Sequence, residues 1–186
     1  MLFKKHRLVL LLSLLVAACN GDDTKNISVV SAKKITLSKD RTYGMDVIYS
    51  DSAHVKARGY APVYDKVTPS QGDQYNEMPE GVKIDFYDET MRITGSITSK
   101  YAINNETSRT TTFRKNVVVV NDKITFTTEE LIWDENKKLY SSPYGTVVTK
   151  DGDLITGSQF SAPQDFSSYR IVTAAGSGYV KDNMQP

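Results

Sequence analysis

The chain has 186 residues, of which 39% are hydrophobic and 24% charged, a composition typical of a folded domain and not of a disordered chain. The formal net charge is +1, but three of the basic residues lie in an amino-terminal segment that resembles a leader; without them, 20 basic residues face 22 acidic ones, about −2. No excess of positive charge is left to bind phosphates, so nucleic acid is not expected as a partner.

Residues 1–18 are predicted to be a lipoprotein signal peptide. A basic start is followed by an apolar run, 8–15, that is too short to span a bilayer comfortably. The junction then reads Leu15-Val-Ala-Ala-Cys19, and Cys19 is the only cysteine in the chain. Small residues before such a cysteine are similar to a bacterial lipobox, although an uncleaved anchor is the alternative. We expect acylation of Cys19, which would attach the mature protein to a membrane outside the cytoplasm.

Residues 19–42 are predicted to be a tether between the lipid anchor and the folded domain. The first residues, 20–26, are polar, whereas 27–37 has some β character that is interrupted by Lys33 and Lys34. An extra edge strand within this segment is an equally good interpretation.

Residues 43–176 show the apolar pattern of β-strands. Val82, Ile84 and Phe86 alternate with Lys83 and Asp85. A period of two means a strand with one buried face and one wet face. The same alternation recurs around 93–98 and 124–127, and no window favours an amphipathic helix. We predict an all-β domain built as a serial antiparallel sheet, followed by a flexible polar tail over 177–186.

Turn signals divide this domain into hairpins. A hairpin turn is expected at 51–53, and a loop is expected to contain Pro62 and to run past Pro69 to Asp73. Ile93-Thr-Gly-Ser-Ile-Thr-Ser-Lys is repeated as Ile155-Thr-Gly-Ser-Gln-Phe-Ser-Ala, 62 residues later. The glycine inside each copy, Gly95 and Gly157, predicts a bulge that curves the sheet.

The sequence offers little for catalysis. His54 is the only histidine after the leader, and it stands beside a predicted hairpin turn. Glu129 and Glu130 are adjacent on a strand and would point to opposite faces, which does not suit a paired-carboxylate site. The aspartates fall in turns, where their side chains cap the backbone. We therefore expect no enzyme, no cofactor and no metal site.

The apolar face of the sheet is the remaining candidate for function. Its residues fit either the filled core of a β-sandwich or a gap that holds acyl chains, and composition alone does not separate the two. The candidate residues are Ile84, Phe86, Ile93, Ile97, Ile124, Phe126, Trp133, Phe160 and Phe166.

Several motifs together resemble the LptC family, the periplasmic members of the lipopolysaccharide export machinery, in the lipoprotein form of Bacteroidetes. The resemblance covers roughly residues 43–173. The motifs are Tyr49-Ser-Asp-Ser, Met78-Pro-Glu-Gly-Val-Lys-Ile-Asp-Phe-Tyr-Asp, the strand from Ile97 to Ala102, Asn116-Val-Val-Val-Val-Asn, Thr127-Thr-Glu-Glu-Leu-Ile-Trp-Asp and Ile155-Thr-Gly-Ser-Gln-Phe.

The resemblance implies a single open, twisted antiparallel β-jellyroll with a groove like that of OstA and LptA proteins. The groove would hold the acyl chains of lipopolysaccharide. The chain would receive this lipid from an inner-membrane ABC transporter of the LptB/LptF/LptG type and pass it to an LptA-like bridge protein by edge-strand addition. It would be periplasmic and lipid-anchored, in this family to the inner membrane. On this basis Phe126→Glu should block lipid transfer without unfolding the domain.

Two other classes of function remain open. The first is a structural or adhesive surface lipoprotein with a filled β-sandwich core. The second is a polysaccharide-binding module that uses Tyr87, Tyr101 and Tyr140 as exposed aromatic side chains.

Overall fold

The computed structural model describes residues 35–177. The described residues belong to one compact unit. The predicted signal peptide, Cys19, the tether up to residue 34 and the tail from residue 178 lie outside the described residues.

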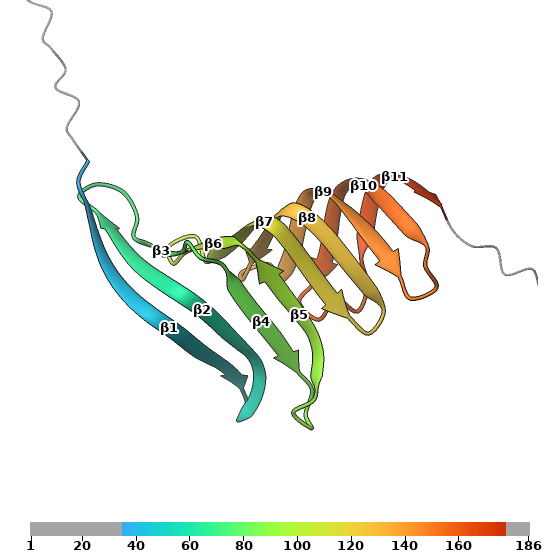
Figure 1. Cartoon of the computed structure of the whole chain (residues 1–186), viewed down its shortest axis with the longest axis horizontal. Coiled ribbons are helices and arrows are strands. Elements are labelled where there is room, and N and C mark those ends of the chain that lie inside the picture. The colour runs from blue at the N-terminus through green and yellow to red at the C-terminus, as the bar shows by residue number, and fades with distance from the viewer. Residues whose placement is uncertain (1–34, 178–186) are drawn as a thin grey trace, which may run out of the picture. The chain divides into compact units, whose positions relative to one another are not determined.

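The described residues form eleven strands and no helix, which confirms the all-β prediction. All the strands belong to one antiparallel sheet with the character of a β-jellyroll (Figure 1). The strands are β1 (Leu37–Asp51), β2 (His54–Pro69), β3 (Tyr75–Met78), β4 (Val82–Tyr87), β5 (Ile93–Ser99), β6 (Tyr101–Asn105), β7 (Thr110–Asn121), β8 (Ile124–Asp134), β9 (Leu139–Thr149), β10 (Leu154–Pro163) and β11 (Arg170–Ser177).

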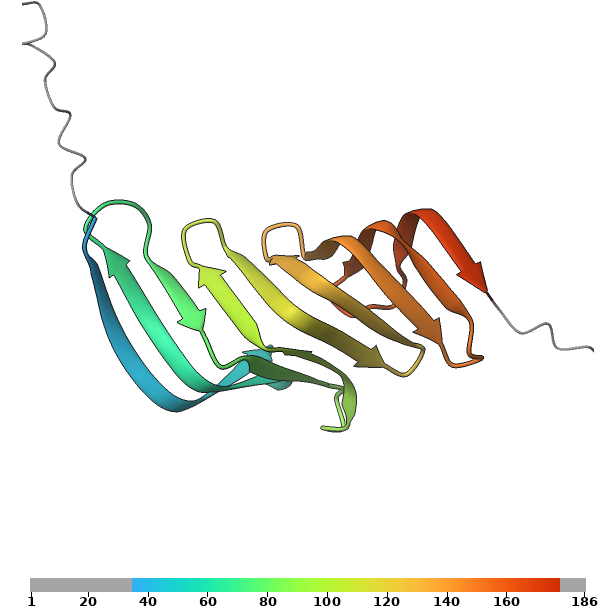
Figure 2. The ribbon, with the colours of Figure 1, turned by 45° about the horizontal axis from the view of Figure 1, so that its top comes forward.

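Neighbouring strands follow one another along the sheet, as Figure 2 shows most clearly from β7 to β11. At the other end β2 pairs with β1 along its length, and its second edge is shared by β4 and β3 in turn. Within residues 35–177, β1 pairs only with β2 and β11 only with β10. The sheet therefore ends in two unpaired edges, which are available for pairing with another chain.

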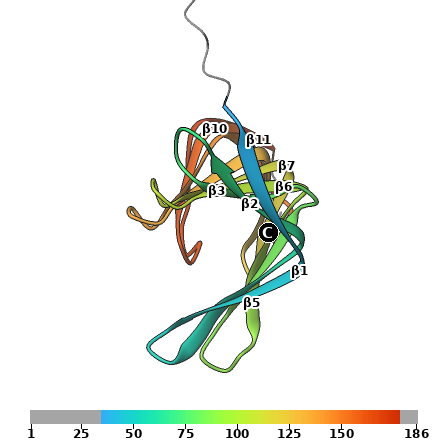
Figure 3. The ribbon, with the colours of Figure 1, turned by 90° about the vertical axis from the view of Figure 1, so that its left-hand side faces the viewer.

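The sheet bends along a line that crosses its long strands, which we call the crease. Figure 3 shows the result end-on, as two arms that diverge from this line. Arm A contains 45–61, 82–99, 117–128 and 145–158, and arm B contains 63–78, 101–114, 130–142 and 160–163. Turns at the far ends of the strands form the tips of the two arms.

The crease reverses the alternation of side chains in the middle of a strand. In β9, Tyr140 and Ser142 are buried before the crease, and Gly145 and Val147 after it. Gly145 lies three positions after Ser142, an odd number, whereas regular alternation would place buried residues an even number apart. Both halves of the strand therefore turn their buried residues to the same concave face. In β7 the change coincides with a register shift at Lys115 and Asn116, both of which have positive φ. A bulge of this kind inserts residues into one strand and bends it.

Two buried serine hydroxyls satisfy backbone groups at the crease, where the ladder of backbone hydrogen bonds is interrupted. Ser99 Oγ donates to the carbonyl of Tyr101 at 2.9 Å, and Ser142 Oγ donates to the carbonyl of Tyr144 at 2.8 Å. Because buried backbone groups rarely lack a partner, these short side chains allow the sheet to bend without leaving polar atoms unpaired.

Pro62 corrects one sequence-based expectation, because it lies inside β2 and not in a loop. It stands at the crease. Before it, Gly59 and Tyr60 pair with β4; after it, residues 65–67 pair with β3. The missing N–H of proline therefore falls where β2 changes partner, so no ladder hydrogen bond is lost.

Several other expectations can be compared with the structure. The hairpin turn at 51–53 is confirmed, and so are the bulges, since register shifts occur beside Gly95 and Gly157. The boundary at 42/43 is wrong, because β1 begins at Leu37, inside the predicted tether. The strand expected from Ile97 to Ala102 is divided at Lys100, where β5 ends and β6 begins.

Candidate functional site

The concave face between the two arms is the candidate site. From β7 to β10 its centre is filled by aromatic side chains. The rings of Phe126 and Phe160 are stacked with their centroids 3.8 Å apart, and both side chains are almost completely buried. Trp133 packs on Tyr140 at 4.5 Å, and Tyr140 stacks on Phe166 at 4.6 Å. This part of the face is a packed core.

Of the nine predicted groove residues, eight face the core and one does not. Those that are buried in it are Ile97, Ile124, Phe126, Phe160 and Phe166, and those packed against it while partly exposed are Ile84, Phe86 and Trp133. Ile93 is 53% exposed, so its placement on the apolar face is wrong. It stands at the start of β5, opposite Tyr87, where the ladder shifts by a residue and the alternation starts afresh.

Phe126 also corrects the expectation attached to it. Its side chain is 0% exposed, and Phe160 covers its ring. A glutamate at this position would place a carboxylate in the packed core, which costs several kcal/mol. We therefore expect Phe126→Glu to unfold the domain, and this expectation replaces that of a folded, transfer-blocked variant.

An open cavity lies at the other end of the concave face, beneath the β1–β2 hairpin. We call it the hairpin cavity. Its volume is about 270 Å³, and its walls come from β1, β2, β3, β4, β6 and β7. The lining is mainly apolar: Met45, Val47, Tyr49, Ala57, Gly59, Tyr60, Ala61, Tyr64, Met78, Val82, Ile84, Asn104, Thr111 and Phe113.

The hairpin cavity is open on the side of β1. The burial of β1 is low along its whole length, and its wall residue Val47 is 48% exposed and Tyr49 54% exposed. Apolar side chains that remain half-exposed around a concave surface are characteristic of a binding surface. Tyr64 marks the polar end of the cavity, where burial and the nearby Glu106 carboxylate raise the pKa of its hydroxyl.

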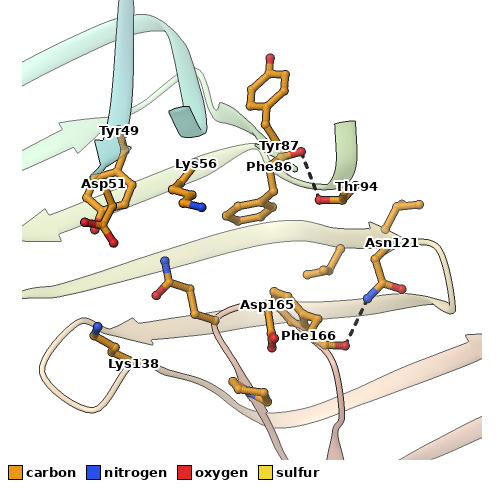
Figure 4. Close-up of a pocket in the computed structure, with 15 residues that line it drawn as sticks. Tyr49, Asp51, Lys56, Phe86, Tyr87, Thr94, Asn121, Lys138, Asp165 and Phe166 are labelled. Carbon is orange, nitrogen blue, oxygen red and sulfur yellow. Dashed lines mark hydrogen bonds between the residues drawn. The ribbon is translucent and has the colours of Figure 1, made fainter. Parts of the chain in front are cut away.

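A second cavity, of about 510 Å³, lies where the tips of the two arms face each other; we call it the seam cavity (Figure 4). Phe86 and Val119 contribute apolar surface from arm A, and Phe166 contributes it from the connection between β10 and β11. Lys56 and Lys138 stand at its rim together with Asp51 and Asp165, so the rim carries both signs of charge.

The outer side of the sheet carries a polar network that holds β1 in place. Arg41 on β1 makes two hydrogen bonds of 2.7 Å to the buried carboxylate of Asp65 on β2. Lys39 on β1 reaches Glu77 on β3 at 2.8 Å, and Glu77 also accepts from Tyr101 Oη at 2.9 Å. The hydrogen bonds from Arg41 lower the pKa of Asp65, and burial together with Glu77 raises the pKa of Tyr101 to about 12.

His54 is the first residue of β2, beside the β1–β2 turn, and its Nδ1 is 2.9 Å from the carbonyl oxygen of Ser52. Asp88 caps its turn as expected, accepting from the backbone N–H groups of Thr90 and Arg92. Among residues 35–177, no three His, Cys, Asp or Glu side chains are grouped so that they could hold a metal ion. The same residues include no helix that is long and apolar enough to cross a membrane.

Sequence reasoning did not identify most residues of the hairpin cavity. Met45 and Val47 lie on β1, and Met78 and Phe113 lie on strands of arm B. Gly44, with φ of 64°, and Pro62 mark where the β1–β2 hairpin crosses the crease. These two residues were the sequence signal that could have indicated the bend and, with it, the cavity residues. A change of phase at these two residues brings Met45 and Val47 to the concave face.

The sequence matches no protein-family model and no curated protein.

Proposed function

We propose that this chain is a non-enzymatic carrier in lipopolysaccharide export that holds the acyl chains of the lipid on the concave face of its sheet. The observation that carries the proposal is the hairpin cavity, an apolar hollow that is open beside an unpaired edge strand. Its volume is close to the lower end of the range for ligand sites, about 300–1,000 Å³. Burial of an acyl chain gains about 0.8 kcal/mol per CH₂, so an open apolar wall is sufficient to retain it.

The two free edges of the sheet support the proposed partners. β1 and β11 each lack a second neighbour within the described residues. A partner of similar fold could extend the sheet at either edge through main-chain hydrogen bonds. In the proposed arrangement one edge meets an inner-membrane ABC transporter of the LptB/LptF/LptG type, and the other meets an LptA-like bridge protein. Acylation of Cys19 would hold the protein at the periplasmic face of the inner membrane.

The packing of the concave face supports one point of entry for lipid in this proposal. The stack of Phe126 on Phe160 leaves no room between the arms at that point. Lipid would therefore enter at the hairpin cavity. Ile84 lines this cavity and would contact the acyl chain of the lipid.

Photocrosslinking in cells tests the proposal. A photoreactive residue at Ile84 should form an adduct with lipopolysaccharide, whereas the same residue at Lys83 should not. Lys83 is the matched control because it is the exposed neighbour on β4, where adjacent side chains point to opposite faces. Equal adducts at both positions, or none at either in a folded protein, would contradict the proposal.

The packed aromatic core favours one alternative, a surface or structural β-protein that binds no lipid. This function would give no adduct at Ile84 and would place the protein on the cell surface. The polysaccharide-binding alternative has less support, because Tyr140 is 4% exposed and stacked within the core. Tyr101 is hydrogen-bonded to Glu77, and Tyr87 is partly buried where it lines the seam cavity.

A further inference from the structure

The connection between β10 and β11, residues 164–169, leaves arm B and returns to it, since Arg170 pairs with Ser161, and it contacts arm A on the way; we call it the strap. On the arm A side, Asn121 Nδ2 donates to the carbonyl of Phe166 at 3.4 Å (Figure 4). Lys123 Nζ donates to the carbonyl of Ser167 at 3.2 Å. The strap therefore joins the tips of the two arms and closes the concave face at this end of the sheet.

The strap places one aromatic ring inside the closed face. Phe166 is 5% exposed, and its ring stacks on Tyr140. On its other side the same residue borders the seam cavity. Removal of this ring would join the seam cavity to the surface of Tyr140, next to Trp133.

The strap is held more weakly than the strands that it connects. Its hydrogen bonds to arm A are two, both from side chains and longer than 3.1 Å, and not a ladder of backbone bonds; the charge of Lys123 also attracts the Asp165 carboxylate. Phe166 also has φ of 49°, a left-handed conformation that is rare for a bulky residue and is strained. Segments with few backbone bonds open locally at low free-energy cost, and release of this strain favours opening.

We propose that the seat of the Phe166 ring is an acyl-chain subsite, occupied in this structure by the protein's own side chain. An acyl chain that enters from the hairpin cavity along Ile84 and Phe86 would reach the seam cavity and replace the ring as the strap swings out. One apolar group is exchanged for another, so the buried apolar area changes little and the exchange is reversible. This inference rests on the proposed function. It adds that the Phe166 ring acts as a plug, which restricts the length of the groove that is open to lipid.

Trp133 provides the reporter, because it is the only tryptophan in the chain and packs on Tyr140. The probe is a lysophospholipid with a brominated acyl chain, used below its aggregation concentration, since bromine quenches indole fluorescence only at close range. The full chain carries Cys19→Ser, together with Lys123→Cys and Ser167→Cys. A bifunctional maleimide then bridges the strap to arm A, and the same protein capped with a monofunctional maleimide is the control. Equilibrium dialysis measures the total probe bound.

The proposal predicts that bridging abolishes quenching of Trp133 while the bridged protein still binds probe. Phe166→Gly removes the ring, and glycine suits the positive φ at this position. If the strap of the native protein is open about a tenth of the time, this variant should reach half-quenching of Trp133 at about tenfold lower probe concentration. Equal quenching of bridged and capped proteins, or bound probe without quenching in capped and Phe166→Gly proteins, would refute the plug and leave the proposed function standing. Absence of bound probe from every variant would overturn both.

Discussion

Gly145 is predicted to be the position in β9 least able to accept a side chain. A Cβ at this residue would overlap Cε2 and Cζ of the Phe126 ring and would lie 2.9 Å from the carbonyl oxygen of Thr127. Phe126 cannot move aside easily, because the Phe160 ring stacks on it at 3.8 Å. Gly145→Ala therefore adds one methyl group to a space that is already full.

The expected cost follows from the packing. Overpacking of a close-packed core destabilises a protein by about 1–3 kcal/mol. For a domain of this size each kcal/mol lowers Tm by about 2–4 °C, so Gly145→Ala should lower Tm by about 2–12 °C. Thermal unfolding followed by far-ultraviolet circular dichroism measures this shift.

Gly59→Ala is the matched control within the same sheet. A Cβ there would meet Ile84 Cγ1 at 3.8 Å, an ordinary van der Waals distance. Because alanine loses less backbone entropy on folding than glycine, this variant should be neutral or more stable by up to about 1 kcal/mol. A comparable loss of stability in both glycine variants would mean that strand glycines matter for a reason other than the Phe126 ring.

A double-mutant cycle with Phe126→Leu tests the cause directly. The smaller side chain lowers stability by itself, but it removes ring atoms that the new methyl group would meet. Gly145→Ala should then cost at least about 0.5 kcal/mol less in the Phe126→Leu background. Additive effects, or a Tm for Gly145→Ala within about 1 °C of the native protein, would refute the reasoning.

Three further predictions address the crease, the outer network and the corrected residue. Ser142→Ala should destabilise the domain by about 0.5–1.5 kcal/mol in urea unfolding, because the carbonyl of Tyr144 loses one donor but keeps Thr128 Oγ1 at 2.6 Å; a loss above about 2 kcal/mol would show that Thr128 does not satisfy this carbonyl. Arg41 lowers the pKa of Asp65, so the stability that this pair contributes is fully present above the unfolded-state pKa of about 4 and is lost as pH falls through the lower folded-state pKa. Asp65→Asn removes this titration and should therefore flatten the decline of Tm between about pH 5 and about pH 2. An unchanged decline of Tm in the variant would contradict this. Ile93→Thr should change stability by no more than about 0.5 kcal/mol, as expected for an exposed side chain, and a loss above 2 kcal/mol would restore Ile93 to the core.

The sequence was informative where a signal is local. Alternation of apolar and polar residues identified the strand segments 82–86 and 124–127, and turn residues located the hairpin at 51–53. Gly95 and Gly157 correctly indicated bulges. These features depend on backbone preferences and on residues within one or two positions, so they can be predicted without knowledge of distant partners.

The candidate site could be predicted only in part, because the crease breaks the alternation on which the prediction depended. Ile97 and Phe126 were correctly assigned to the concave face, since both lie within one arm. Leu131 was missed although it is completely buried, because an odd step separates it from Phe126 across the crease. A rule with a period of two cannot be carried through a bulge, and the bulge at 115–116 depends on pairing between β7 and β8.

By itself, the sequence determined that this protein is an antiparallel β domain with one apolar face, because period-two patterning and turn chemistry are properties of short segments. Only the tertiary structure decided how much of that face is filled. Whether Phe126 lines a groove or closes one depends on the approach of Phe160 from β10, two strands away in the sheet. The open hairpin cavity depends in the same way on how β1 and β2 cross the crease. Such contacts between distant residues are set by the curvature of the whole sheet, which no short stretch of sequence encodes.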